Sequence, residues 1–141
     1  MSVQRKIDAF FTLADRGVRA ANVLFDEDLF EDATLYVQQV VERVARALLT
    51  HAGVSFGTSH NLGQMAEAFP VGHPFKERIR AFDALSSAVT AFRYPTSTGR
   101  LQQPPQTGEL RNSIDEAERL LRDAKVYIYG PRTDQPVGRM K

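Results

Sequence analysis

Arg93, Tyr94 and Pro95 follow one another where a helix-like pattern of apolar residues ends. The arginine offers a planar set of N–H donors that matches phosphate or carboxylate, and the tyrosine ring can stack on a nucleobase. Together the two side chains are typical of a site for a ligand that joins a phosphate to a base. The alternative is structural, because Arg93 can also close the carboxyl end of a helix while Tyr94 packs against its neighbours.

A second group of polar residues follows helical spacing upstream. Gln38, Glu42 and Arg46 are four residues apart, so they share one face of a helix beside its apolar stripe. Glu42 precedes Arg46 in the orientation that favours an exposed ion pair, which is worth only about 0.2–0.5 kcal/mol. The spacing alone favours a face that meets solvent or a second copy of the chain, and a ligand site is the alternative.

Metal, phosphate-loop and nucleophile patterns are missing from the sequence. The histidines, His51, His60 and His73, form no pair at metal-ligand spacing, and the chain has no cysteine to supply a thiolate. No glycine-rich segment leads into Lys-Ser or Lys-Thr, and no nucleophile elbow is present. We therefore assign no catalytic residue and no metal ligand from these patterns, and we expect no cofactor.

The composition is that of an ordinary globular domain. The 141 residues are enough for one domain with its own core, and 43% are hydrophobic while 25% are charged. The net charge of +1 gives no reason to expect a whole-surface attraction to nucleic acid or to anionic membranes. No apolar run has signal-peptide length at the amino terminus or the roughly 18 residues of a membrane span. The chain is therefore expected to be cytoplasmic, without a membrane partner.

Four long segments carry apolar residues at steps of three and four, which predicts a helix in each. These segments cover residues 3–25, 30–48, 75–92 and 110–128. A shorter segment, residues 61–70, has the same pattern. Because each apolar stripe needs a partner to bury it, the segments predict an all-α fold, an antiparallel four-helix up-and-down bundle with an additional short helix.

Local signals mark the ends of these helices. Asp28, with an acidic residue three positions later, predicts a capping box at the start of the second helix. Asn61 with Gln64 predicts another before the short helix. Gly53 predicts that the second helix ends at a glycine in the left-handed backbone conformation. Gly17 predicts a bend in the first helix.

The chain divides into a bundle and a tail. Residues 1–130 are predicted to form the bundle, and residues 131–141 lack periodicity and are predicted to be a flexible tail. Residues 94–108 are rich in proline, glycine and hydroxyl side chains, which predicts a long loop of a kind that is often functional. Val44 and Leu121 are expected to be buried in the common core.

In order and spacing, these motifs resemble the HEPN family of small helical domains. The second helix matches the alanine, tyrosine, glutamine, glutamine and glutamate of a family pattern at Ala33, Tyr36, Gln38, Gln39 and Glu42. A lysine-alanine-leucine-leucine run is matched, with arginine in first place, by residues 46–49. A threonine-histidine-aspartate-leucine element is matched, with a serine inserted and asparagine for aspartate, by Thr58, His60, Asn61 and Leu62. The family's arginine-tyrosine-proline falls on residues 93–95, and the resemblance covers residues 7–128.

This resemblance implies a helical bundle that binds nucleotides, serves as the partner of a minimal nucleotidyltransferase, or cuts RNA. The ligand-binding candidates are Arg93, Tyr94, His60, Glu42 and Arg46. Family members also commonly form homodimers. Val41 and Leu49, which flank the main stripe of the second helix, are our candidates for dimer contacts.

One departure from the family bears on catalysis. Ribonucleases of the family carry an Arg-x4–6-His motif near the start of the last long helix, and no histidine follows Arg93 here. Arg46 and His51 match the motif literally, but five helical steps leave their side chains about 140° apart. The sequence therefore predicts a non-catalytic HEPN module that binds a nucleotide, RNA or a nucleotidyltransferase. The alternatives are a toxin-like ribonuclease with a displaced histidine and a helical interaction module without a ligand.

Overall fold

The computed structural model describes residues 2–93, 95–101, 103 and 105–131, without the side chains of residues 87, 90, 92 and 93. Over this part of the chain the structure is helical and contains no strand. The helices are α1 (Val3–Asp26), α2 (Phe30–His51), α3 (Leu62–Ala68), α4 (Lys76–Arg80), α5 (Asp83–Arg93) and α6 (Thr107–Tyr129). The predicted tail lies outside the described residues apart from Pro131, so its flexibility stays a prediction.

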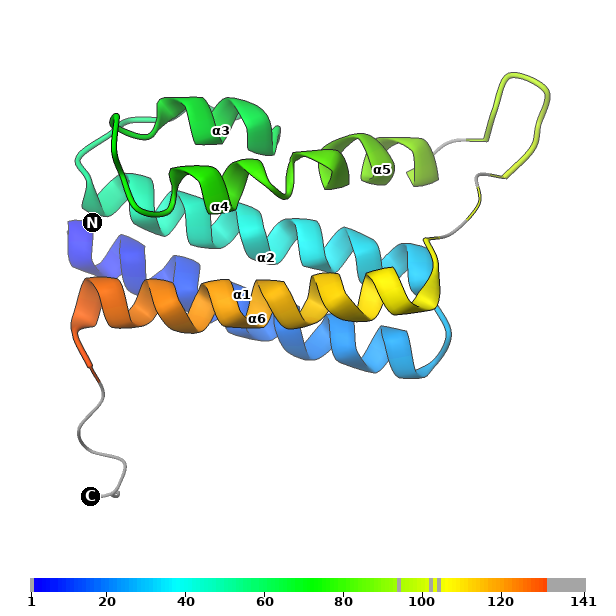
Figure 1. Cartoon of the computed structure of the whole chain (residues 1–141), viewed down its shortest axis with the longest axis horizontal. Helices are drawn as coiled ribbons and strands as arrows, with labels where there is room; N and C mark the ends of the chain where they lie inside the picture. Colours follow the sequence, from blue (N-terminus) through cyan, green and yellow to red (C-terminus); the bar gives the residue numbers. More distant parts are fainter. Residues whose placement is uncertain (1, 94, 102, 104, 132–141) are drawn as a thin grey trace.

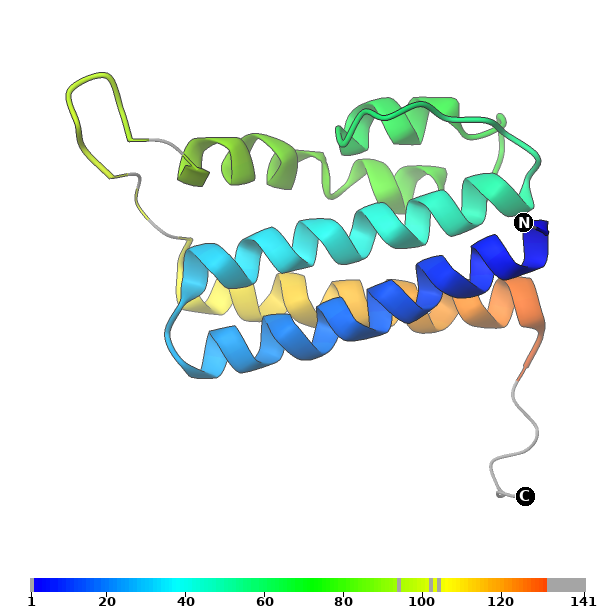
Figure 2. The same cartoon turned by 180° about the vertical axis from the view of Figure 1, so that it is seen from behind.

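The long helices run side by side and alternate in direction (Figure 1). α1 and α2 form a hairpin, α6 lies against both, and α4 with α5 forms a further row along α2 (Figures 1 and 2). The short α3 packs against α4 at one end of the bundle. This arrangement confirms the all-α, up-and-down bundle that the sequence predicts.

The core lies around α2, which contacts α1, α3, α5 and α6. Val44 on α2 is 0% exposed and Leu121 on α6 is 5% exposed, which confirms the prediction for both residues. Ile7 and Phe11 bring the stripe of α1 into the same core. Because a tightly packed core refills a cavity only in part, truncation of Leu121 to alanine would cost on the order of 2–4 kcal/mol.

α2 is buried on more of its surface than its apolar stripe predicts. Val41 is 0% exposed and Leu49 is 1% exposed within a single chain, so our interpretation of these residues as dimer contacts is wrong. Gln38 and Glu42 are each 5% exposed, so the solvated or dimer-facing stripe favoured by their spacing is wrong as well. The reason is that the segment before α3 covers this side of α2 and hydrogen-bonds to it.

The third long helix is interrupted. α4 and α5 are separate helices where the sequence predicts one helix over residues 75–92. At the break the Phe82 N–H donates to the carbonyl of Ile79, three residues back rather than four. The Asp83 carboxylate then accepts a hydrogen bond of 3.0 Å from the Gly63 N–H. The interruption therefore brings the start of α5 against the start of α3.

One predicted helix cap differs from the structure. Asp28 does not cap α2: it takes a φ of 61° in the turn after α1, a conformation that aspartate tolerates, and its N–H donates to the Phe25 carbonyl. Leu29 precedes α2 without a side-chain cap. α1 continues through Gly17, where a Cβ would lie 2.7 Å from Val40 Cγ2, so the glycine permits the close approach of α1 and α2.

Polar contacts fasten α6 to α1. The Lys125 ammonium lies 2.8 Å from the Asp15 carboxylate, and the Tyr129 hydroxyl donates a hydrogen bond to Asp8. Burial and then this hydrogen bond raise the pKa of Tyr129 to about 12. The Tyr129 hydroxyl therefore keeps its proton at any ordinary pH, and its hydrogen bond from α6 to Asp8 on α1 is kept as well.

Candidate functional site

A buried carboxylate lies at the centre of the candidate site. The Glu42 side chain on α2 is only 7% exposed. Its Oε2 lies 2.6 Å from His60 Nδ1 and 3.2 Å from Arg46 Nε. Because a buried carboxylate is costly unless donors surround it, these contacts are what hold it in place. The structure thus brings together three of the five residues that the sequence singled out.

Arg46 uses its guanidinium inside the protein. Besides Glu42, it donates to the carbonyl oxygens of Gly57 at 3.0 Å and Ser59 at 2.8 Å. Its guanidinium carbon also lies 5.5 Å from the centre of the Phe56 ring, a cation–π distance. These contacts hold the segment before α3 against α2. Arg46 is therefore a support of the site rather than a group that faces a ligand.

The segment that carries His60 is fixed at both ends. On one side, the Gln38 side-chain amide donates to the His60 carbonyl at 2.9 Å. On the other, the Asn61 side chain accepts from the Gln64 N–H at 2.8 Å, which confirms the predicted cap of α3. The second half of that capping box is absent, because the Gln64 side chain accepts from the Ser59 hydroxyl at 2.6 Å instead. His60 thus sits on a well-anchored turn.

α5 holds the start of α3 in the same region. Leu62 N–H donates to the Ser86 hydroxyl at 3.1 Å, and Gly63 N–H donates to Asp83. Both N–H groups belong to the first turn of α3, where the backbone N–H groups have no acceptor within their own helix. A Cβ on Gly63 would lie 2.7 Å from the Asp83 carboxylate, so glycine is needed for this close approach. α5 is thereby positioned opposite α2.

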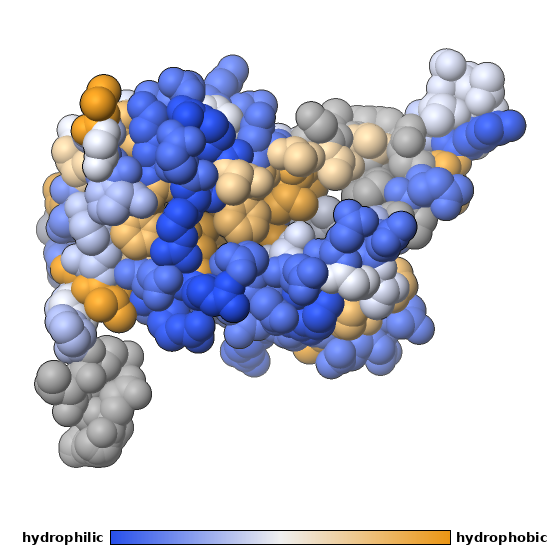
Figure 3. All heavy atoms as spheres, viewed as in Figure 1, coloured by the Kyte–Doolittle hydropathy of each residue, from blue (hydrophilic) through white to orange (hydrophobic). Residues whose placement is uncertain are grey.

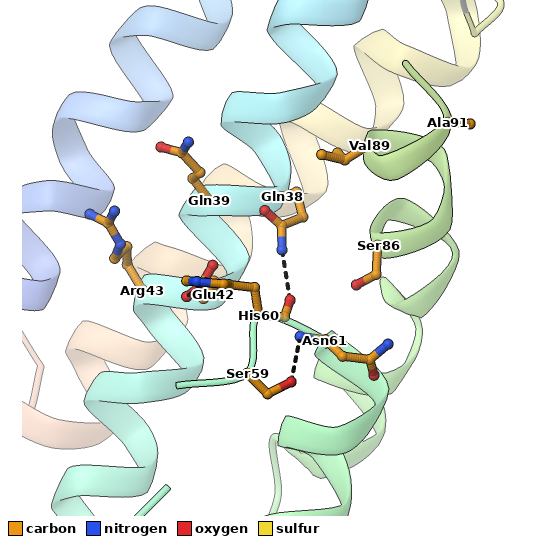
Figure 4. A pocket seen from close by; sticks show the side chains of 10 residues that line it. All are labelled: Gln38, Gln39, Glu42, Arg43, Ser59, His60, Asn61, Ser86, Val89 and Ala91. Atoms are coloured by element: carbon orange, nitrogen blue, oxygen red, sulfur yellow. Dashed lines mark hydrogen bonds and ion pairs between the residues drawn. The ribbon is translucent and has the colours of Figure 1, made fainter. Parts of the chain in front are cut away.

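α2, the segment before α3, and α5 enclose a pocket of about 740 Å³ (Figure 4). Its lining is formed by Gln38, Gln39, Glu42, Arg43, Ser59, His60, Asn61, Ser86, Val89 and Ala91. The His60 side chain is 76% exposed, although its Nδ1 is held by Glu42. Most of the lining residues have polar side chains, and Val89 and Ala91 add an apolar stretch on α5.

Arg43 is a pocket residue that our sequence analysis missed. Figure 4 shows Gln39 and Arg43 extending from α2 on the side away from α5, whereas Ser86 and Val89 lie on α5 itself. In the part of the chain that the structure describes, the Arg43 guanidinium has no hydrogen-bond or ion-pair partner. A free guanidinium near an exposed imidazole suits an anion, and phosphate above all. The four-residue step from Gln39 to Arg43 is the signal that could have identified it.

The predicted pair at the end of the third helix is placed only in part. Arg93 is the last residue of α5, the helix that contributes Val89 and Ala91 to the pocket. The Arg93 side chain and the whole of Tyr94 lie outside the described residues. Their part in a site therefore stays a prediction.

The other histidines lie away from this pocket. The His51 ring lies 5.8 Å from the Tyr127 ring, so Arg46 and His51 face different neighbours, as their spacing predicts. The His73 ring packs at 4.7 Å from the Phe69 ring. Within residues 2–93, 95–101, 103 and 105–131, no group of three or more His, Asp or Glu side chains could hold a metal ion.

Comparison with known proteins agrees with this architecture. No curated protein and no solved structure gives a significant match. Among the described residues, no helix combines the length and apolar character that crossing a membrane requires. A family model described as the HEPN domain matches residues 7–128, the span over which the sequence motifs resemble that family. Because this match takes in most of the chain, the protein belongs to the HEPN family.

Proposed function

We propose that this HEPN domain is a non-catalytic module that binds a nucleotide, free or within RNA, in the pocket between α2 and α5. The observation that supports this most is the Arg43 guanidinium, which has no partner in the described part of the chain and lines a polar pocket beside the exposed His60. A guanidinium without a partner suits phosphate. Membership of a nucleotide-binding or ribonuclease-like family points in the same direction.

The pocket also suits the remainder of a nucleotide. Arg43 would hold the phosphate next to His60, and the apolar stretch formed by Val89 and Ala91 would lie against the base. The Gln39 side chain offers an amide donor and acceptor for a base edge. The volume of about 740 Å³ is in the range typical of small-molecule sites.

Arg93 and Tyr94 would extend this site from the end of α5. Arg93 would add a second guanidinium for phosphate, and Tyr94 would stack on a base. Glu42 and Arg46 would act indirectly, by placing His60. In this proposal the five predicted residues contribute, but only His60, Arg93 and Tyr94 touch the ligand.

We also propose that the domain works as the partner of a minimal nucleotidyltransferase. The pocket opens to solvent between α2 and α5, so a ligand held there stays within reach of a second protein (Figure 4). Coexpression with a minimal nucleotidyltransferase would test this. Elution of both proteins as one complex in gel filtration is expected, and separate elution in the presence of ATP would contradict it.

The binding proposal is tested by calorimetric titration with ATP, GTP and a short RNA. Arg43→Ala, and separately Arg93→Ala, should weaken binding by about 1–3 kcal/mol, the range for a charge-assisted hydrogen bond. Arg119→Ala is the matched control, because it removes an exposed arginine on α6 whose ion-pair partner is the nearby Glu116. Equal affinities of Arg43→Ala and Arg119→Ala would place the ligand elsewhere.

A second candidate function is supported by one contact. The 2.6 Å separation of Glu42 Oε2 and His60 Nδ1 is an arrangement in which a carboxylate orients an imidazole for proton transfer. A toxin-like HEPN ribonuclease could therefore use His60 in place of the missing motif histidine. RNA cleavage that is lost in His60→Ala and kept in His51→Ala would support this function. Absence of cleavage across a panel of RNAs would contradict it.

A further inference from the structure

We infer that Glu42 is a positioning residue that fixes the tautomer of His60, so that the imidazole turns an unprotonated Nε2 toward the pocket and selects a ligand with a ribose hydroxyl. The assignment of the His60 tautomer rests on the geometry of Glu42, Arg46 and His60. The choice of ligand rests in addition on the proposed binding function.

The charge state of Glu42 is the first step. Its Oε2 accepts from Arg46 Nε at 3.2 Å and lies 2.6 Å from His60 Nδ1, so two nitrogen atoms converge on one oxygen. The permanent positive charge of the guanidinium favours the ionised carboxylate. An ionised carboxylate has no proton to donate and can only accept hydrogen bonds.

The tautomer follows from that charge state. Because Oε2 of Glu42 can only accept, Nδ1 of His60 must carry the proton that joins them. In a neutral imidazole the proton sits on one nitrogen, so Nε2 is left with a lone pair. The side chain is 76% exposed and lines the pocket, so this lone pair is available to a ligand.

The protein backbone around His60 keeps this arrangement in place. The His60 carbonyl accepts from the Gln38 amide at 2.9 Å, and the preceding Ser59 carbonyl accepts from Arg46 at 2.8 Å. Arg46 therefore binds both the carboxylate that orients the ring and the turn that carries it. The ring cannot turn away from Glu42 without breaking contacts of a buried charge, which is costly.

An Nε2 lone pair selects a particular kind of ligand group. It accepts from a hydroxyl but offers nothing to a phosphate oxygen, so in the neutral form His60 pairs with a donor while Arg43 pairs with the phosphate. A ribose hydroxyl next to a phosphate presents both groups together, and it is the feature by which proteins distinguish RNA from DNA. The pocket should therefore prefer ribonucleotides to deoxyribonucleotides.

The tautomer is measured directly, without a ligand, in a long-range proton–nitrogen correlation spectrum at a pH where the imidazoles are neutral. His60 should show the Nδ1–H form. His73 is an internal control, because its Nδ1 accepts from the Phe75 N–H at 3.1 Å and so its proton must be on Nε2. In Glu42→Gln the His60 signals should move toward the Nε2–H form, whereas Glu31→Gln, an exposed change on the same helix, should leave them unchanged.

Ligand selection is measured by titrating a short RNA and the DNA of the same sequence. One hydrogen bond to a hydroxyl should give the RNA a roughly two- to tenfold advantage over the DNA. His60→Ala, an exposed change, and Glu42→Gln should each bring that ratio close to one, while DNA binding through Arg43 is kept.

Each result has a single consequence. An Nε2–H tautomer for His60 in the unaltered protein would overturn the positioning role of Glu42, whether or not a ligand binds. Equal affinity for RNA and DNA would overturn the hydroxyl selection. Failure of every nucleotide and RNA to bind would instead contradict the proposed function, and the tautomer measurement would still decide the role of Glu42.

Discussion

Arg43 and Arg46 stand within one turn of each other on α2 but have opposite surroundings. Arg46 donates to Glu42 and to two backbone carbonyls, so its removal would leave a buried carboxylate without its cation and release the turn that carries His60. Arg43 lines the pocket and has no partner among the described residues, so its removal changes only the pocket surface. Substitutions at the two positions should therefore separate support of the site from contact with the ligand.

His73 is a second residue whose surroundings have a measurable consequence. Its Nε2 is buried without a hydrogen-bond partner, the only side-chain atom of this kind among the described residues. The ring packs at 4.7 Å from Phe69 and 5.5 Å from Tyr127. Burial lowers the pKa of His73, and the charge of His51 lowers it further. The folded protein therefore disfavours the protonated form of this side chain.

Stability should fall on mild acidification because of His73. Below pH 6.5, the ordinary pKa of histidine, His73 is protonated in the unfolded chain but stays neutral in the folded protein. The free energy of unfolding therefore decreases as the pH falls from 6.5 to the lower pKa that His73 has in the folded protein. Above that ordinary value the contribution is fully present. Urea unfolding across this pH range should show less pH dependence for His73→Phe than for the unaltered protein. An identical pH dependence of the two would contradict the assignment.

The candidate site could be predicted only in outline from the sequence. Glu42, Arg46 and His60 were identified through the family motifs, and they do lie together. Their burial could not be predicted, because helical spacing does not tell which loop will cover a polar face. Arg43 could not be separated from other surface arginines either. Whether a guanidinium is free depends on residues distant in the sequence, and these become neighbours only in the fold.

For the helices too, features set by the local sequence pattern could be predicted, and features set by contacts distant in the sequence could not. α1, α2 and α6 lie close to their predicted bounds, because a continuous apolar stripe and long length determine each of them. The break between α4 and α5 was not predicted, since no glycine or proline interrupts residues 75–92. It coincides instead with contacts from Asp83 and Ser86 to the start of α3. Those contacts join segments that are far apart in the sequence.

Gly17 should be required for the packing of α1 on α2. Alanine is favoured over glycine within a helix by about 1 kcal/mol, yet the added Cβ at position 17 would lie 2.7 Å from Val40, whose branched side chain is stiff in a helix. Gly17→Ala should therefore destabilise the fold, by about 1–3 kcal/mol in denaturant unfolding. Gly108→Ala in α6, where nothing lies within 4 Å of the new Cβ, is the matched control and should not destabilise. Equal effects of the two changes would contradict this role.

Within the part of the chain that the structure describes, an apolar surface is left uncovered. An apolar furrow of about 470 Å³ lies between the α4–α5 row and α6 (Figure 3). Its apolar lining includes Ala81, Phe82, Ala84, Leu85, Ala88 and Leu110. Contiguous apolar surface of this kind commonly marks protein contacts. With Val41 and Leu49 buried, this furrow is the better surface for the predicted homodimer.

The homodimer stays a prediction that light scattering can test. At micromolar concentration the mass should be that of two chains, with a specific interface of about 1,200–2,000 Å² in total. Ala84→Glu places a charge on an exposed position of the furrow and should shift the protein toward the monomer. Ala9→Glu, on an exposed position of α1, should not. A monomer mass for the unaltered protein would contradict the prediction.

Chemical-shift mapping of the backbone amides during titration with ATP and a short RNA tests the central claim most directly, because it locates the ligand. The largest changes are expected around the pocket between α2 and α5, at Arg43, Ser59, His60, Asn61 and Ser86. Arg43→Ala should reduce these changes at equal ligand concentration. Changes concentrated instead along the α1–α6 groove, near Asp15 and Lys125, or no changes at all, would contradict the account.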